Sequence, residues 1–181
     1  PEYAHVPFVA EPGSKNKLSK RKIAQYLKNP DFKKVYEHAQ AIADQIAVNA
    51  APESFNPVLI DFYKDVGYIP DAILNYLVLL GWSLDDKTEA FTREGMIRHF
   101  SLERVTKSAA SFDAKKLFAF QERYMQSVPL AEKVERVLPF LQRAGINADR
   151  AIVTHIVEAA GPRLKVFGDI LDSADFFTAD D

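Results

Sequence analysis

Apolar residues recur at helical spacing along most of the chain. After Asn29 and Pro30, which suit an N-cap and a first helical position, apolar side chains fall three or four residues apart up to position 46. Similar patterns follow Asp113 and Pro129. The chain is therefore predicted to be mainly α, with helices over residues 30–48, 58–66, 70–81, 93–99, 102–107, 114–127, 129–144 and 147–160, and with one more beginning near 163.

Two segments depart from this pattern. Tyr3, Val6, Phe8 and Val9 predict a short strand, and the small, polar and basic residues from 13 to 21 predict a loop after it. Within 72–80 the residues are almost all apolar, apart from Asn75, which is typical of a buried helix.

Composition narrows the chemistry. The chain has 181 residues, of which 48% are hydrophobic and 27% charged, as expected for a globular fold. It has no cysteine, which excludes disulfides and thiolate metal sites, and its four scattered histidines have no zinc-site spacing, so no metal site and no zinc are expected. No apolar run approaches the ~18 residues of a membrane span.

Charge is distributed unevenly. The net charge is −2, but residues 13–36 hold eight basic residues and one acid, and the last thirteen residues hold five aspartates and no base. A concentrated basic stretch attracts phosphates, although many such runs are only solvated surface.

The segment Lys17-Leu18-Ser19-Lys20-Arg21 lies in this basic stretch. Its ammonium groups and hydroxyl suit contacts with a polyphosphate, and Gly13 upstream gives the loop freedom to move. The segment is not a P-loop, because the glycine and lysine spacing of that motif is absent. Considered alone, it is equally consistent with an ordinary basic loop.

Three ordered blocks resemble the glutamyl-tRNA synthetases. Residues 17–21 resemble the K-M-S-K-S signature of class I aminoacyl-tRNA synthetases, in the K-L-S-K-R form typical of glutamyl enzymes. Residues 67–83, GYIPDAILNYLVLLGWS, resemble a second block, and Ser111-Phe112-Asp113 with Lys116, Leu117 and Tyr124 resembles a third. Phe118 and Gln121 stand where the family often has Trp and Asn. The resemblance covers roughly residues 5–125.

The resemblance implies ATP-dependent activation of glutamate and its transfer to tRNA(Glu). By position, Lys20 would be the catalytic lysine that stabilises the triphosphate, within an ATP-binding set of Lys17, Leu18, Ser19, Lys20 and Arg21. The implied partners are ATP with Mg²⁺, glutamate and tRNA(Glu). A cytoplasmic, monomeric enzyme with no membrane contact is expected.

The resemblance also implies a domain order. Residues 1–25 would end the catalytic domain, 26–66 form a helical insertion or linker, 67–112 form a stem-contact region, and 113–181 begin the helical anticodon-binding domain. The family's H-I-G-H-type motif and its glutamate-binding residues are absent from the chain. We expect them in a preceding part of a longer protein, and we expect this C-terminal fragment alone to be inactive.

Contacts with tRNA should come from basic side chains on the later helices. The candidates are Arg104, Lys107, Lys115, Lys116 and Arg123, each of which is also consistent with solvated surface charge. We expect Trp82, His99 and His155 to have structural roles.

Two other functions remain open. One is a non-catalytic tRNA-binding module, and the other is a glutaminyl-tRNA synthetase relative, although the second block favours the glutamyl type. The sequence does not show whether the parent enzyme also charges tRNA(Gln).

Overall fold

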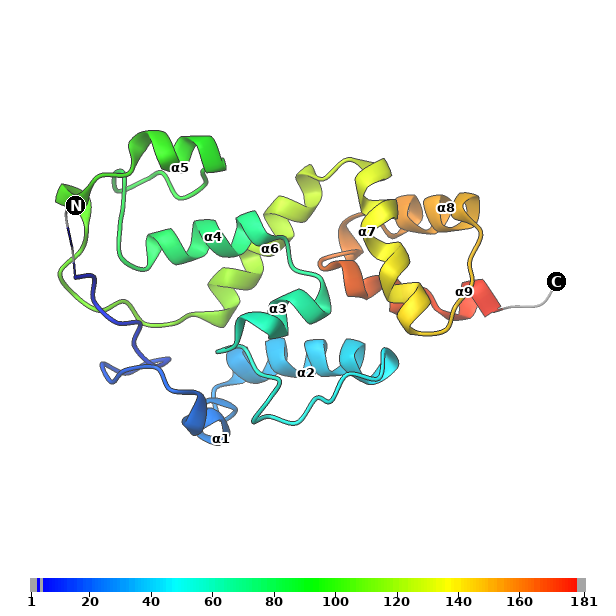
Figure 1. Cartoon of the computed structure of the whole chain (residues 1–181), viewed down its shortest axis with the longest axis horizontal. Coiled ribbons are helices and arrows are strands. Elements are labelled where there is room, and N and C mark those ends of the chain that lie inside the picture. Colours follow the sequence, from blue (N-terminus) through cyan, green and yellow to red (C-terminus); the bar gives the residue numbers. More distant parts are fainter. Residues whose placement is uncertain (1–2, 4, 179–181) are drawn as a thin grey trace.

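The computed structural model describes residue 3 and residues 5–178, and this part of the chain is mainly helical (Figure 1). The helices are α1 (Ile23–Tyr26), α2 (Pro30–Gln45), α3 (Ile60–Val66), α4 (Pro70–Leu79), α5 (Arg93–His99), α6 (Ala114–Ser127), α7 (Leu130–Arg143), α8 (Arg150–Ala160) and α9 (Asp175–Thr178). Short 3-10 turns are η1 (Lys20–Lys22), η2 (Leu102–Arg104), η3 (Gly161–Arg163) and η4 (Phe167–Ser173). The prediction of a mainly α fold is confirmed.

Several helix starts lie where local capping residues predicted them. The side chains of Asn29, Thr92 and Asp113 each accept a backbone N–H from the first turn of α2, α5 and α6, at 3.0, 3.0 and 2.8 Å. The eighth helix begins later than predicted, at Arg150, because Asp149 caps it by accepting the N–H of Ala151.

Three predicted elements are corrected. The helix expected to begin near 163 is instead the pair of 3-10 turns η3 and η4, because Asp169 accepts the N–H groups of Lys165 and Val166 and turns the chain between them. Residues 3 and 5–9 form no strand, and near them only isolated bridges join Ala10 to Lys17 and to Ser111. The helix predicted at 102–107 is only η2, because Thr106 donates its N–H to the carbonyl of Gly81 at 2.7 Å and the chain is drawn out beside Trp82.

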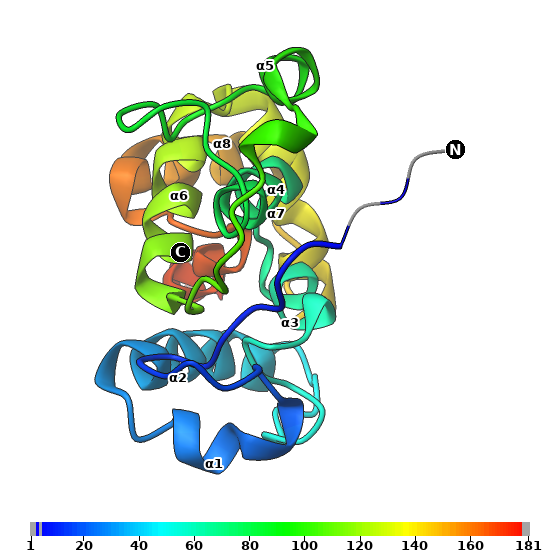
Figure 2. The same cartoon turned by 90° about the vertical axis from the view of Figure 1, so that its left-hand side faces the viewer.

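The helices surround one continuous buried core. Helix α6 packs against α4 and α2, and α7 packs against α8 and η4 (Figures 1 and 2). Buried residues of this core run from Ile23 to Leu171, so residues 26–66 contribute to the same core as the later helices. A smaller cluster of Trp82, Phe91 and Met96 lies beneath α5. The four-part domain division stays a prediction.

Gly67 allows a close approach in this core. Its φ of +88° is left-handed, and a Cβ added there would lie 2.7 Å from Phe140 Cζ and 2.8 Å from Phe167 Cβ. The carbonyl of Gly67 accepts the N–H of Phe167 at 3.1 Å. The Gly-Tyr-Ile-Pro turn therefore fits directly under η4 and α7.

The described residues carry neither a membrane-spanning helix nor a metal-binding cluster. None of their helices combines the length and the apolar character that crossing a bilayer requires. Across residues 3 and 5–178 there is also no group of three or more His, Asp or Glu placed to hold a metal ion.

Candidate functional site

The basic segment follows a small hairpin. Glu11 donates its N–H to the carbonyl of Asn16 at 2.8 Å, and Leu18 donates its N–H to the carbonyl of Val9 at 2.9 Å. Gly13 makes the turn with a φ of +68°. This pairing turns the chain back on itself and fixes where Lys17 and the residues after it begin.

Ser19 begins the second half of the segment. Its side chain accepts the N–H of Arg21 at 3.4 Å as the cap of η1, and its own N–H donates to Tyr26 Oη at 3.0 Å. Tyr26 is buried, 3% exposed, and packs edge-on against Phe32 of α2. The turn that carries Lys20 is thus fixed to the core through Tyr26.

The basic side chains in this segment differ in whether an acidic side chain already pairs with them. Lys17, Lys20 and Arg21 are exposed, and none of them has an ion-pair partner among the described residues. Lys22 instead lies 2.5 Å from the carboxylate of Glu11, and this hydrogen bond raises the pKa of Lys22. Three cations therefore face solvent on a segment whose end is already neutralised.

The hairpin also contacts the start of α6. Ala10 donates its N–H to the carbonyl of Ala110 at 2.8 Å and accepts the N–H of Phe112 at 2.9 Å. Ser111 Oγ donates to the carbonyl of Glu11 at 2.6 Å and accepts the N–H of Gly13 at 3.1 Å. The hairpin that leads into residues 17–21 is therefore in direct contact with the third sequence block.

The second and third blocks meet through Tyr76. Its hydroxyl accepts the N–H of Asp113, the N-cap of α6, at 2.7 Å. Burial raises the pKa of Tyr76, so this hydroxyl stays protonated at neutral pH. All three blocks that resemble one family are thus joined by hydrogen bonds.

Asn75, the polar residue within the apolar stretch of α4, makes three hydrogen bonds. It is fully buried, its Nδ2 donates to the carbonyl of Glu89 at 2.8 Å, and its Oδ1 accepts from the N–H of Phe91 at 2.9 Å and the hydroxyl of Tyr124 at 2.9 Å. The amide thereby fixes the segment before α5 against α4 and α6.

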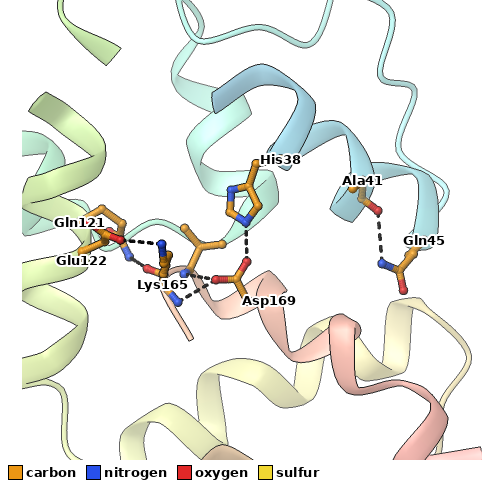
Figure 3. Close-up of polar contacts among 8 residues, drawn as sticks. His38, Ala41, Gln45, Gln121, Glu122, Lys165 and Asp169 are labelled. Atoms are coloured by element: carbon orange, nitrogen blue, oxygen red, sulfur yellow. Dashed lines mark hydrogen bonds and ion pairs between the residues drawn. The ribbon is translucent and has the colours of Figure 1, made fainter. Parts of the chain in front are cut away.

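Gln121 performs a similar task about one turn before Tyr124 on α6. Its Oε1 accepts the N–H of Ile69 and its Nε2 donates to the carbonyl of Lys165, both at 2.8 Å. Asp169 caps the following turn and pairs with His38 of α2 at 2.7 Å, as Figure 3 shows. Because Gln121 is fully buried, it is a structural residue and makes no surface contact with RNA.

The five predicted tRNA contacts differ in their surroundings. Lys116 pairs with Glu89 at 2.7 Å, Arg104 donates to the carbonyl of Leu84, and Arg123 lies 5.7 Å from the centre of the Phe120 ring. Lys115 borders a cavity of about 530 Å³ between α2, α6 and residues 163–172, and Lys107 is exposed. Neither of these two lysines has an ion-pair partner within the described part of the chain.

Trp82 packs as predicted, whereas His99 and His155 lie outside the core. Trp82 is 2% exposed and packs against Phe91 and Phe100 with ring centres 5.7 and 5.9 Å apart. His99 and His155 are exposed, so neither ring packs in the core.

Comparisons with known proteins agree with the three blocks. The sequence model of the class I tRNA synthetases (E and Q), catalytic domain, matches residues 55–119, a range that begins after the 17–21 segment. A glutamate–tRNA ligase from Desulforudis audaxviator is 32% identical over all of this chain and 30% of its own length. One from Herpetosiphon aurantiacus is 40% identical over 65% of this chain and 25% of its own length.

Solved structures give the same result. A glutamate–tRNA ligase from Elizabethkingia meningosepticum, in complex with its amino acid, superposes with a TM-score of 0.67 at 25% identity, over 97% of this chain and 32% of that one. The chain belongs to the glutamyl-tRNA synthetases. It spans about 30% of the length of such relatives. The similarity therefore concerns only that part of each glutamyl-tRNA synthetase.

Sequence reasoning missed the residues that hold the segment from 17 to 21, which resembles the family signature and is called the signature loop below. Glu11, Tyr26 and Ser111 were not singled out as loop contacts, because their partners depend on the hairpin and on a contact across about 100 residues. The one available signal was that Ser111 opens a block shared with the family, which did not indicate what it touches.

Proposed function

We propose that this chain supplies the ATP-side loop of a glutamate–tRNA ligase that joins glutamate to tRNA(Glu). The observation that carries the proposal is the set of exposed cations Lys17, Lys20 and Arg21 on a segment held at both ends. Cations without a protein counter-ion are free to bind phosphate oxygens. Glutamate–tRNA ligase relatives that match the whole chain support the choice of reaction.

In the first step, an oxygen of the glutamate carboxylate bonds to the α-phosphorus of ATP. The bond from that phosphorus to the bridging oxygen breaks, and pyrophosphate leaves with the electron pair. Negative charge grows on the leaving group, and the Lys20 ammonium stabilises it, with Lys17 and Arg21 beside it. The hydroxyl proton of Ser19 is free to donate to a phosphate, since the Ser19 oxygen serves as the cap acceptor.

Mg²⁺ would enter with the nucleotide and neutralise part of the phosphate charge. In the second step, a ribose hydroxyl at the tRNA 3′ end attacks the activated carbonyl carbon of glutamate. AMP then leaves, and the amino acid is joined to the tRNA by an ester bond. The chain's contribution to this second step is to hold the tRNA.

Lys20→Ala in the ligase that contains this chain tests the proposal. We expect ATP–pyrophosphate exchange, measured with glutamate and tRNA present, to fall about 100-fold in kcat, the usual size for one lost electrostatic contact to a transition state. The matched control is Lys28→Ala, which removes an equally exposed lysine outside the loop. Unchanged exchange in Lys20→Ala, or an equal loss in both variants, would rule out the role of Lys20.

The proposed tRNA contacts are Arg104, Lys107, Lys115, Lys116 and Arg123. Lys107 and Lys115 lack ion-pair partners among the described residues, so a phosphate need not displace a protein contact to reach them. Lys116 would first have to leave Glu89. We therefore rank Lys107 and Lys115 first among the five.

A further inference from the structure

The hairpin that leads into residues 17–21 is attached to the start of α6 by the Ser111 side chain as well as by backbone hydrogen bonds. Ser111 Oγ donates to the carbonyl of Glu11 at 2.6 Å and accepts the N–H of Gly13 at 3.1 Å. These two bonds connect both sides of the first hairpin turn to a residue 100 positions away in the chain. The backbone bonds of Ala10 on either side of Ser111 keep the two segments in register.

Glu11 links this attachment to the other end of the loop. Its side chain is only 2% exposed, and its Oε1 lies 2.5 Å from Lys22 Nζ. The backbone of Glu11 thus contacts Ser111 while its carboxylate contacts the residue directly after Arg21. One residue closes the segment from 11 to 22 into a loop.

The free charges lie inside this closed segment. Ser111 and Glu11 fix its two ends, and they make no contact with the ammonium group of Lys20. A charge that is already in place when the substrate arrives stabilises a transition state better than one that must be ordered first. The side chains that hold the loop therefore matter to the chemistry without touching the nucleotide.

We infer that Ser111 and Glu11 are positioning residues for adenylate formation, acting through Lys20. This inference rests on the proposed function, because it needs Lys20 to act on the triphosphate. It gives the residues just before α6 a role in the ATP site, although they belong to the helical part of the chain. If Ser111 were purely structural, Ser111→Ala would lower the stability of the protein without a specific effect on the use of ATP.

The test is a double-mutant cycle in the ligase that contains this chain, with Ser111→Ala, Lys20→Ala and the two combined. We expect Ser111→Ala, which removes both hydrogen bonds of this side chain, to lower kcat/KM for ATP in pyrophosphate exchange about tenfold. The KM for glutamate should stay unchanged. In the Lys20→Ala background, Ser111→Ala should have no further effect, since the group it positions is gone.

Two further variants separate positioning from folding. Ser111→Thr keeps the hydroxyl in an extended segment that accepts a β-branched residue, so it should restore most of the activity. Glu11→Gln keeps the shape but removes the charge facing Lys22, and it should show the same loss for ATP as Ser111→Ala with the same dependence on Lys20.

The possible failures are distinguishable. If Lys20→Ala reduces exchange but Ser111→Ala does not, or if their effects simply add, the positioning inference is overturned and the proposed function stands. If Lys20→Ala leaves exchange unchanged, the proposed role of the loop is overturned, and the positioning inference with it.

Discussion

Gly67 adopts a left-handed backbone conformation beneath two phenylalanine rings. Its φ is +88°, and a Cβ at this position would lie 3.0 Å or less from Phe140 Cζ, Phe167 Cβ and the Phe167 backbone nitrogen. A side chain here carries both the backbone penalty of a positive φ and a steric clash. A single hydrogen atom at this position therefore allows α3, α7 and η4 to meet.

Gly67→Ala should destabilise the chain by about 2–4 kcal/mol, because neither the backbone nor the Phe167 nitrogen is free to move away. Urea unfolding followed by circular dichroism measures the effect. Gly81→Ala is the matched control, since its φ is not left-handed and nothing lies within 4 Å of the added Cβ. Equal midpoints for the two variants would contradict this account of Gly67.

At the scale of elements, α4 and α6 pack against each other, and α5 and α2 pack against this pair. Helix α4 is apolar on most of its surface, yet it carries the buried Asn75, whose amide satisfies groups on Glu89, Phe91 and Tyr124. Burial raises the pKa of Tyr124, which keeps its hydroxyl a donor to Asn75 at neutral pH. One side chain thus fixes a loop and two helices.

Asn75→Leu tests whether this amide holds the elements together. Leucine has a similarly branched side chain but leaves the Phe91 N–H and the Glu89 carbonyl unpaired. We therefore expect a loss of about 2–4 kcal/mol in unfolding free energy. Leu77→Ala, at a position 47% exposed on the same helix, should cost less than about 1 kcal/mol. Hydrogen exchange should also quicken at residues 89–91 in Asn75→Leu alone, and unchanged protection there would contradict the assignment.

At the scale of the whole molecule, local and distant interactions differ in how well the sequence predicts them. The starts of α2, α5 and α6 were predictable, because each cap forms between residues three apart. The exposed signature loop was predictable from its polar residues and from resemblance. Glu11 meets Lys22 only because the hairpin turns back, and Ser111 reaches Gly13 only because α6 starts beside that hairpin.

The same distinction applies to the candidate RNA contacts. Basic side chains were predictable from the sequence, but their ion pairs were not, since Glu89 reaches Lys116 across a loop of the chain. The buried position of Gln121 likewise follows from contacts with residues 69 and 165. Availability of a charge is therefore a property of the folded molecule, and it is the property that binding measures.

The binding of tRNA to this chain should depend on those available charges. The chain has a net charge of −2, so attraction must come from local cations, and we expect weak binding that falls steeply as salt is added. Each lysine that contacts a phosphate contributes about 1 to the slope of log K against log salt. Lys107→Ala and Lys115→Ala should each reduce the slope by about that amount. Lys116→Ala should reduce it less, because Glu89 already neutralises this lysine.

Fluorescence anisotropy of labelled tRNA over a salt series measures these slopes. Lys64→Ala is the control, since it removes an exposed lysine of α3 that is outside the proposed set. Its slope should equal that of the unchanged chain. If affinity did not change with salt, phosphate contacts would not account for binding, and if Lys64→Ala matched Lys107→Ala, the charge would act through the whole surface. A reduced slope for Lys107→Ala and Lys115→Ala alone would place the RNA backbone next to those two residues.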